Sequence, residues 1–173
     1  MKVTWGISGL QFLGGTTLLA AILVGAFPLL TFAQAATHTG KSFAQKLVET
    51  TRAKHPELDE IGISAITSRG CIGVASTDKT DIGGKCEKED SEPMHTGKPV
   101  VEKEKDGFDV TLPLHDSAGR MIGSVGFGFK PGQGQTEDSV TGQAQKVAAE
   151  MEAKIPSKAK LLEGTVDAPA RAT

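Results

Sequence analysis

Apolar residues spaced three and four apart predict a first helix over residues 42–54. Ser42 has the type of side chain that caps a helix, and a proline two residues after the segment ends it. Beyond this helix the spacing changes to an alternation of apolar and other residues over 61–67 and 72–77, on either side of a turn at 68–70. This part of the chain therefore predicts a helix followed by a β-hairpin.

The middle of the chain combines a turn-rich segment with a second hairpin. Residues 78–85 are rich in turn formers, and residues 87–96 are charged and predict a short helix that ends before a glycine. Residues 100–105 and 108–115 then flank Asp106-Gly107, a dipeptide favoured in two-residue hairpin turns because both central residues need positive φ. We therefore expect a tight hairpin centred on this dipeptide.

The last elements predicted are a strand over residues 120–130 and a helix over 136–155. One side of this helix carries apolar residues at helical spacing: Val140, Ala144, Val147, Ala148, Met151 and Ile155. Runs of adjacent antiparallel strands with helices outside the sheet indicate an α+β fold, with a five-stranded antiparallel sheet and N-terminal and C-terminal helices. We expect a lead-in at 36–41, one domain at 42–156 and a flexible C-terminal tail at 157–173.

The first 35 residues have the pattern of a secretory signal peptide. Lys2 precedes a long apolar stretch without Lys, Arg, Asp or Glu, which ends in Ala33-Gln34-Ala35. A basic start, an apolar middle and a small-x-small site predict cleavage after residue 35. The alternative is an uncleaved anchor over residues 5–32, which are numerous enough to span a bilayer. Both interpretations place the domain outside the cytoplasm, in the periplasm or the medium.

Cys71 and Cys86 are the two cysteines of the chain, and both follow the leader. Thiols in exported proteins oxidise, so we expect a disulfide between them. In the loop-entropy model a cross-link of this length stabilises the fold by about 3 kcal/mol. The alternative is a thiol-disulfide redox protein, although the pair lacks the Cys-x-x-Cys spacing of most redox motifs.

Composition excludes several classes of partner. The formal net charge is −2, whereas binding to nucleic acid needs clustered Lys and Arg. The chain has no Tyr, its one Trp lies in the leader, and four aromatic residues follow it: Phe43, Phe108, Phe127 and Phe129. We expect these rings to lie in the core, which leaves no stacking platform and no aromatic cage for quaternary ammonium groups.

No catalytic, cofactor or metal motif is present in the sequence. Residues 123–126 lack one residue of the Gly-x-Ser-x-Gly elbow and lie within a predicted strand. There is no phosphate loop and no dinucleotide fingerprint, and the four histidines show no metal-ligand spacing. We therefore expect a protein that is not an enzyme and that carries no cofactor and no metal.

Three stretches of the chain resemble the single Cache domains, PAS-like extracellular sensor modules of bacteria. They are residues 75–83, 96–99 and 112–123, and the last contains the pattern Pro-Leu-x-Asp-x-x-Gly-x-x-Ile-Gly. The resemblance covers residues 42–155. It implies an antiparallel sheet with a long N-terminal helix on one face and a small-molecule pocket formed by the other face and its loops. Because the last helix is followed only by a tail, we expect a stand-alone module without its own transmitter domain.

Strand alternation selects candidate ligand-binding residues. On the strand 108–115 the apolar residues share one face and the polar ones the other, and on the last strand Ser124 shares its face with Gly126 and Gly128. Bare backbone of this kind permits close approach by a ligand or a helix. The predicted ligand-binding residues are Ser76, Asp78, Asp109, Thr111, His115 and Ser124.

The ligand expected for this polar face is a small polar metabolite such as a carboxylate. The expected protein partner is a membrane-bound signalling protein or a second copy of the chain. The alternative is that the face is solvated or covered by a helix, in which case the domain is a structural or protein-interaction module of the cell envelope.

Overall fold

The computed structural model describes residues 41–105 and 107–165. The predicted signal peptide, residues 36–40 of the lead-in and the last eight residues of the tail lie outside this part of the chain. Within it, no helix has both the length and the apolar character needed to cross a membrane.

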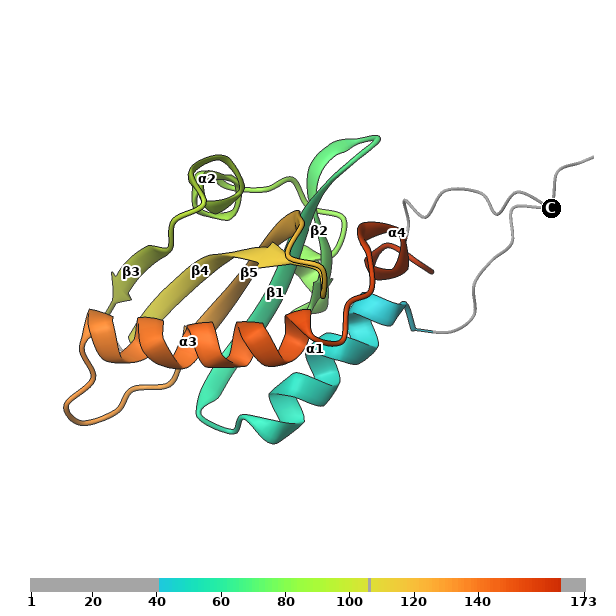
Figure 1. Ribbon diagram of the computed structural model, residues 1–173. Coiled ribbons are helices and arrows are strands. Elements are labelled where there is room, and N and C mark those ends of the chain that lie inside the picture. The colour runs from blue at the N-terminus through green and yellow to red at the C-terminus, as the bar shows by residue number, and fades with distance from the viewer. Residues whose placement is uncertain (1–40, 106, 166–173) are drawn as a thin grey trace, which may run out of the picture. The chain divides into compact units, whose positions relative to one another are not determined.

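Five antiparallel strands form one sheet in the order β2-β1-β5-β4-β3 (Figure 1). The strands are β1 Leu58–Thr67, β2 Gly70–Ser76, β3 Val100–Glu104, β4 Gly107–His115 and β5 Met121–Phe129. The two predicted hairpins join through β5, which pairs with β4 on one side and with β1 on the other, where Ile63 lies opposite Val125. The predicted α+β fold with a five-stranded antiparallel sheet is thereby confirmed.

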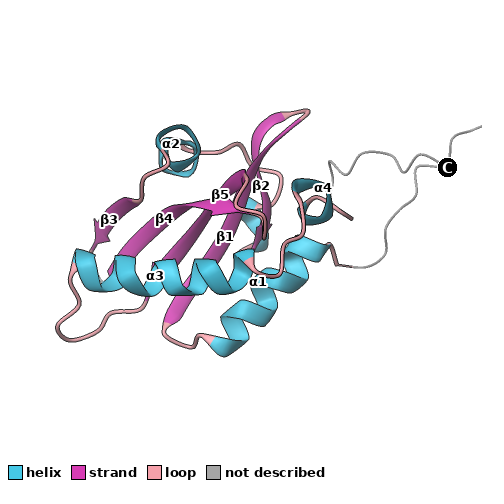
Figure 2. Cartoon of the chain, viewed as in Figure 1, coloured by secondary structure: helices cyan, strands magenta, loops and turns pink. Residues whose placement is uncertain are grey.

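Helices lie on both faces of this sheet, and they are not equivalent (Figure 2). They are α1 Phe43–Lys54, α2 Lys88–Thr96, α3 Glu137–Glu152 and α4 Lys158–Leu161, with a short 3₁₀ turn, η1, at Lys79–Asp81. The ribbon shows α1 and α3 on one face and α2 on the other. Ser42 caps α1 as predicted, because its hydroxyl accepts a hydrogen bond from the Gln45 backbone N–H at 3.1 Å.

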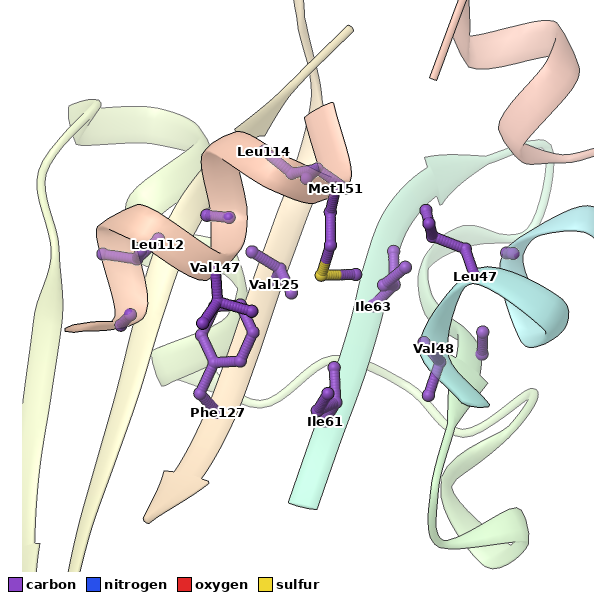
Figure 3. Close-up of a cluster of buried hydrophobic side chains, with 14 of the residues drawn as sticks. Leu47, Val48, Ile61, Ile63, Leu112, Leu114, Val125, Phe127, Val147 and Met151 are labelled. Carbon is purple, nitrogen blue, oxygen red and sulfur yellow. The ribbon is translucent and has the colours of Figure 1, made fainter. Parts of the chain in front are cut away.

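The hydrophobic core lies between the sheet and the pair α1 and α3. Figure 3 shows its central side chains, contributed by both helices and by β1, β4 and β5. All six apolar residues predicted on one side of the last helix are buried, including Ile155, which follows the end of α3. Phe108, Phe127 and Phe129 are buried and the partly buried Phe43 packs against the core, so the four rings belong to the core as expected.

The prediction of a flexible tail over residues 157–173 is wrong for its first part. Ser157 caps α4, and Leu161 and Leu162 are buried in the core. The carbonyl of Glu163 also accepts a hydrogen bond from the Phe43 backbone N–H at 3.1 Å, next to the start of α1. A single helical turn contains too few residues to show a periodicity, so the sequence pattern did not indicate that these leucines have a place to pack.

The hairpin between β3 and β4 is confirmed, but its glycine has a different role from the one predicted. Gly107 is the first residue of β4, pairs with Glu104 and does not have a positive φ. A Cβ at this position would collide with the carbonyl oxygen of Phe129 on β5. Glycine is therefore required by the close approach of two strands and not by the turn.

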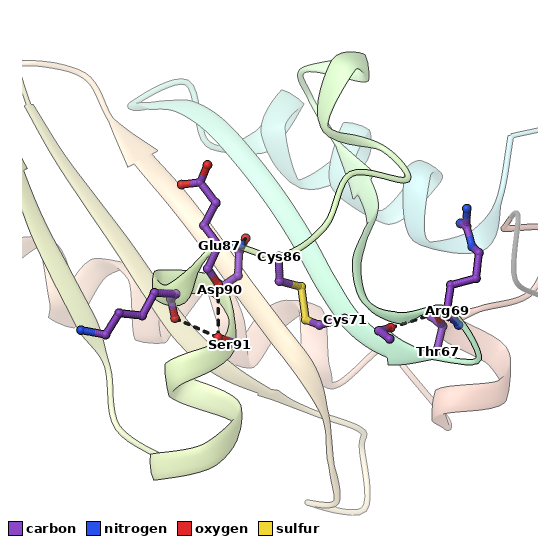
Figure 4. Close-up of a disulfide and its surroundings, with 9 residues drawn as sticks. Thr67, Arg69, Cys71, Cys86, Glu87, Asp90 and Ser91 are labelled. Atoms are coloured by element: carbon purple, nitrogen blue, oxygen red, sulfur yellow. Dashed lines mark hydrogen bonds between the residues drawn. A yellow bond between two sulfur atoms is a disulfide. The ribbon is translucent and has the colours of Figure 1, made fainter.

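The predicted disulfide between Cys71 and Cys86 is present, with the Cα atoms 5.4 Å apart (Figure 4). It joins β2 to the segment that leads into α2. Backbone hydrogen bonds run beside it, since Cys86 N–H donates to the Cys71 carbonyl at 3.2 Å and Gly73 N–H donates to the Gly84 carbonyl at 2.9 Å. The segment 83–86 is thus held along β2 by a covalent bond and a short ladder.

Two glycine substitutions test this packing in opposite directions. We expect Gly107→Ala to lower the free energy of unfolding by about 1–3 kcal/mol, because its methyl group meets the Phe129 carbonyl. The matched control, Gly142→Ala, lies within α3 with no atom near its Cβ and should raise the free energy of unfolding by up to about 1 kcal/mol. Urea unfolding measures both, and a neutral Gly107→Ala would contradict the close approach.

The double variant Cys71→Ser/Cys86→Ser tests the cross-link. We expect a loss of about 3 kcal/mol in the free energy of unfolding, because the disulfide closes a loop of 15 residues in the unfolded chain. Urea unfolding of the variant and of the oxidised protein gives the difference. Equal stability would contradict a structural role, and free thiols in the native protein on alkylation under denaturing conditions would favour the redox alternative.

Candidate functional site

A cavity of about 460 Å³ lies on the sheet face opposite the core. Its floor includes Gly62 and Ser64 of β1, Thr111 of β4, and Gly126 and Gly128 of β5. Its walls come from the segment around η1 and from the first turn of α2. The loops and the small helix therefore border a partly open space over the side of the sheet that α1 and α3 leave free.

The glycines of the floor provide room. A Cβ on Gly126 would lie 3.6 Å from Thr111 Oγ1, and one on Gly62 would lie 4.0 Å from Ser76 Oγ, which are ordinary contacts. By contrast, a Cβ on Gly73 would lie 2.5 Å from the Asp81 carbonyl oxygen. Packing thus requires a glycine in β2, where the wall touches the strand. A Cβ on Gly128 would also be crowded, at 3.2 Å from Asp109 Oδ1. Gly62 and Gly126, however, have room for a side chain, and as glycines they leave the cavity open.

The wall at η1 is held by hydrogen bonds as well as by the disulfide. Asp78 caps η1, its carboxylate accepting from the Thr80 backbone N–H at 2.9 Å and the Thr80 hydroxyl at 2.8 Å. Ser76 Oγ accepts from the Asp78 backbone N–H at 3.0 Å. It also lies 3.2 Å from the Asp81 carboxylate, to which it can donate. The wall is therefore anchored to the sheet at both ends, at Ser76 and at Cys86.

Carboxylates dominate the lining of the cavity. Seven acidic side chains line it, and Lys85 is the single basic residue among the lining residues. The acids are Glu60, Asp81, Glu87, Glu89, Asp90, Glu102 and Asp109. They come from β1, β3, β4, η1 and the start of α2, spread over about fifty positions of the chain, so no local sequence pattern indicates that they face one space.

The acidic environment shifts the titration of two floor residues. Loss of hydration raises the pKa of Glu60 above its ordinary value, and the neighbouring Asp81 carboxyl raises it further. Loss of hydration also raises the pKa of Asp109, and Glu104 adds to this. In both cases the charged form is disfavoured because like charges and partial burial act in the same direction.

The structure brings together three of the predicted ligand-binding residues. Ser76, Asp109 and Thr111 line the cavity. Asp78 is not among the lining residues, and its carboxylate is used to cap η1. Ser124 is buried next to the floor as the Cα partner of Ser64, and its hydroxyl has no hydrogen-bond partner in the described structure.

The prediction that places His115 with these residues is wrong. The pairing of β4 with β5 shifts between Leu114 and His115, so the alternation of faces ends there. His115 Nδ1 lies 2.9 Å from Glu152 Oε1 of α3, and its backbone N–H donates to the same oxygen at 2.7 Å. His115 therefore joins the end of β4 to a helix of the core layer, away from the cavity.

The pattern behind the family resemblance forms a turn. The buried Asp116 carboxylate accepts hydrogen bonds from the backbone N–H groups of Ala118 and Arg120, both at 3.0 Å, and from the Arg120 side chain at 2.8 Å. Burial alone would raise the pKa of Asp116, but these bonds and the Arg120 charge lower it. Gly119 takes a φ of 77°, so the Asp and the Gly of the pattern both serve the turn between β4 and β5.

The described parts of the chain contain no preformed metal site. No group of three or more His, Cys, Asp or Glu side chains within residues 41–105 and 107–165 is arranged to hold a metal ion. The seven carboxylates thus surround a space and do not converge on a point.

No model of a known protein family matches the chain, and no curated protein matches it. Among solved structures, the chain is similar to the GAF domain of a two-component sensor histidine kinase from Bacillus halodurans, with 12% identity, 64% of this chain and 91% of that chain covered, and a TM-score of 0.47. It is also similar to the sensor domain of DcuS from E. coli, with 17% identity, 59% and 71% covered, and a TM-score of 0.38.

A further match is the GAF domain of a phosphoenolpyruvate-protein phosphotransferase from Acinetobacter, with 12% identity, 65% of this chain and 84% of that chain covered, and a TM-score of 0.42. Because sequence identity and structural similarity are low in all three matches, a functional proposal for this chain has to rest on its own cavity.

The substitution Glu60→Gln tests the electrostatics of the cavity. Because the pKa of Glu60 is raised in the folded state, ionisation of Glu60 lowers the free energy of unfolding at a pH above the ordinary pKa of a Glu carboxyl. Below that pH the side chain is protonated in both states, and the destabilisation disappears. We expect Glu60→Gln to raise Tm at pH 7 and the gain to disappear towards pH 4. The control Glu150→Gln, on the opposite side of the sheet, removes a carboxylate that lies 3.4 Å from His55 Nε2 and should not raise Tm at pH 7. A gain for Glu60→Gln that persists at pH 3 would contradict the assignment.

Proposed function

We propose that the chain is an exported sensory module, similar to a single Cache domain, that binds a small molecule in this cavity and signals its occupancy to a partner protein. The observation that supports it most directly is the cavity of about 460 Å³, whose floor has glycines at positions 62 and 126 where side chains would fit. Small-molecule sites commonly have volumes of roughly 300–1,000 Å³.

Unused hydrogen-bonding groups at the floor support the same proposal. Ser64 lines the cavity although only 7% of its surface is exposed, and Ser124 beside it is 1% exposed. Ser124 Oγ has no partner within the described residues, and a buried polar group without a partner is costly. Ser124 is not itself a lining residue, so a ligand would supply its missing hydrogen bond by reaching past Ser64.

Binding without catalysis fits the residues that line the cavity. Its lining contains hydroxyls and carboxylates but no histidine and no cysteine, and the two cysteines are bonded to each other. A hydroxyl nucleophile needs an adjacent base that is oriented by a third group. Ser76 has carboxylates beside it but no such relay, so we propose a protein that is not an enzyme.

The exported location is supported by two independent features. The leader has the pattern of a signal peptide, and the disulfide is of the kind that forms in oxidising compartments. The signalling partner we propose is a membrane-bound protein or a second copy of the chain.

A cavity-filling variant tests the proposal. A library of polar metabolites is screened by thermal unfolding of the purified protein, and each hit is measured again with Gly126→Val. The new Cβ makes only an ordinary contact, at 3.6 Å from Thr111 Oγ1, so the variant should fold, while its methyl groups occupy the cavity and reduce the affinity about tenfold or more.

The control for this screen is Gly142→Ala, which changes a glycine of α3 far from the cavity lining and should leave affinity unchanged. If no metabolite shifts Tm, or if the hits bind Gly126→Val as tightly as the wild type, the proposed site is wrong. Recovery of a specific envelope protein with equal yield on the wild type and on Gly126→Val would then favour the interaction module.

A further inference from the structure

We infer that the ligand of this cavity is an organic cation with primary or secondary ammonium groups, of the polyamine type, and not the carboxylate expected from the sequence. This inference rests on the proposed function and specifies its ligand class. It follows from two independent properties of the cavity: the sign of its charge, and the hydrogen-bonding capacity that the protein leaves unused.

The charge of the lining repels anions. Glu60, Asp81 and Asp109 lie around the floor, and Lys85 is the one ammonium group among the lining residues. A carboxylate ligand would add a further negative charge to a space in which like charges already disfavour the ionised forms of Glu60 and Asp109. A cation would instead relieve this repulsion, and the field of the cavity would attract it from solution.

The outer acids Glu87, Glu89, Asp90 and Glu102 form the rim of the cavity. Two of them have a separate explanation and are weaker evidence for a cationic ligand. Glu87 is the N-cap of α2, and its backbone N–H donates to the Asp90 carboxylate at 3.0 Å, which closes a capping box. These two acids stabilise the start of a helix whether or not a ligand binds. Glu89 and Glu102, however, line the cavity without a hydrogen bond in the described structure, so the rim still presents acceptors to a second cationic group.

The second observation is the pair of serines at the floor. Ser64 and Ser124 are Cα partners on β1 and β5, so their side chains lie next to each other on the same face of the sheet. Ser64 is more than nine-tenths buried and lines the cavity, and the hydroxyl of Ser124, directly behind the lining, has no hydrogen-bond partner in the described part of the chain. Together with Thr111, these serines supply oxygen atoms that can accept hydrogen bonds from a ligand.

The acceptors define the type of cation. Ionised carboxylates only accept hydrogen bonds, so the ligand has to bring the donors. A primary ammonium group brings three N–H donors, whereas a quaternary ammonium group brings none and requires aromatic rings. Phe127 is the one aromatic residue among the lining residues, and it is buried in the core. The chemistry therefore favours an amine with several N–H groups.

The distribution of the acids favours an extended ligand over a metal ion. The inner acids around the floor are Glu60, Asp81 and Asp109, and they belong to other elements than the rim acids. The described residues contain no cluster arranged for a metal. A chain that carries an ammonium group at each end can contact the inner acids with one end and the rim with the other. A single divalent ion cannot reach both.

The experiment compares four probes by calorimetry and by thermal unfolding of the purified protein. They are 1,4-diaminobutane, succinate with the same number of carbons, choline and calcium chloride. We expect diaminobutane to bind and to raise Tm, and the other three to do neither. Asp109→Asn should weaken diaminobutane binding about tenfold or more, because it removes a charge-assisted hydrogen bond, and the matched control Glu150→Gln should change it less than about twofold.

Several outcomes would overturn the inference. Succinate binding that Gly126→Val abolishes would replace the cation by an anion and leave the proposed function intact. Equal binding of choline would remove the requirement for donors, and binding of calcium alone would replace the amine by a metal. Equal weakening by Asp109→Asn and Glu150→Gln would show attraction to the surface in general. If neither these probes nor the metabolite library binds, the proposed function fails as well.

Discussion

Burial of one face of the sheet against α1 and α3 is the constraint on which the remaining features depend. Apolar side chains of β1, β4 and β5 enter this layer at every second position, and α4 closes it next to α1 through Leu161 and Leu162. Because strand side chains alternate, the same strands present their intervening residues to the opposite face. That face is not needed for the core, so it can carry glycines, hydroxyls and carboxylates.

Cross-links between the strands and the loops turn this second face into the floor of a partly open cavity. The disulfide and the hydrogen bonds of residues 83–86 hold the wall against β2, and Ser76 holds the start of the same segment. The cavity is therefore built from a stable sheet and a tethered loop, so little conformational freedom remains to be lost when a ligand binds. Its acids nevertheless disfavour the empty, fully ionised state, which is a common cost of a functional site.

Local patterns were sufficient to predict most of the fold. Helical spacing located α1 and α3, alternation located the strands, and the position of the two cysteines after the predicted signal peptide indicated their pairing. Alternation also selected Asp109, Thr111 and the glycines of β5 as one face, since a strand without irregularity keeps its two faces apart. The same rule failed for His115, because an irregularity in the pairing lies just before it, and for α4, because one turn has no visible period.

The sequence by itself determined the elements, their order and which residues of each strand share a face, because these depend on neighbours within a few positions. It did not determine which helices and loops cover the two faces of the sheet. Only the tertiary structure brought Glu60, Asp81, Glu89, Glu102 and Asp109 around one space, since their separation along the chain gives no local signal. Contacts between distant segments decided that the charge of the cavity is negative. This charge is the reason why the proposed ligand changed from a carboxylate to an amine.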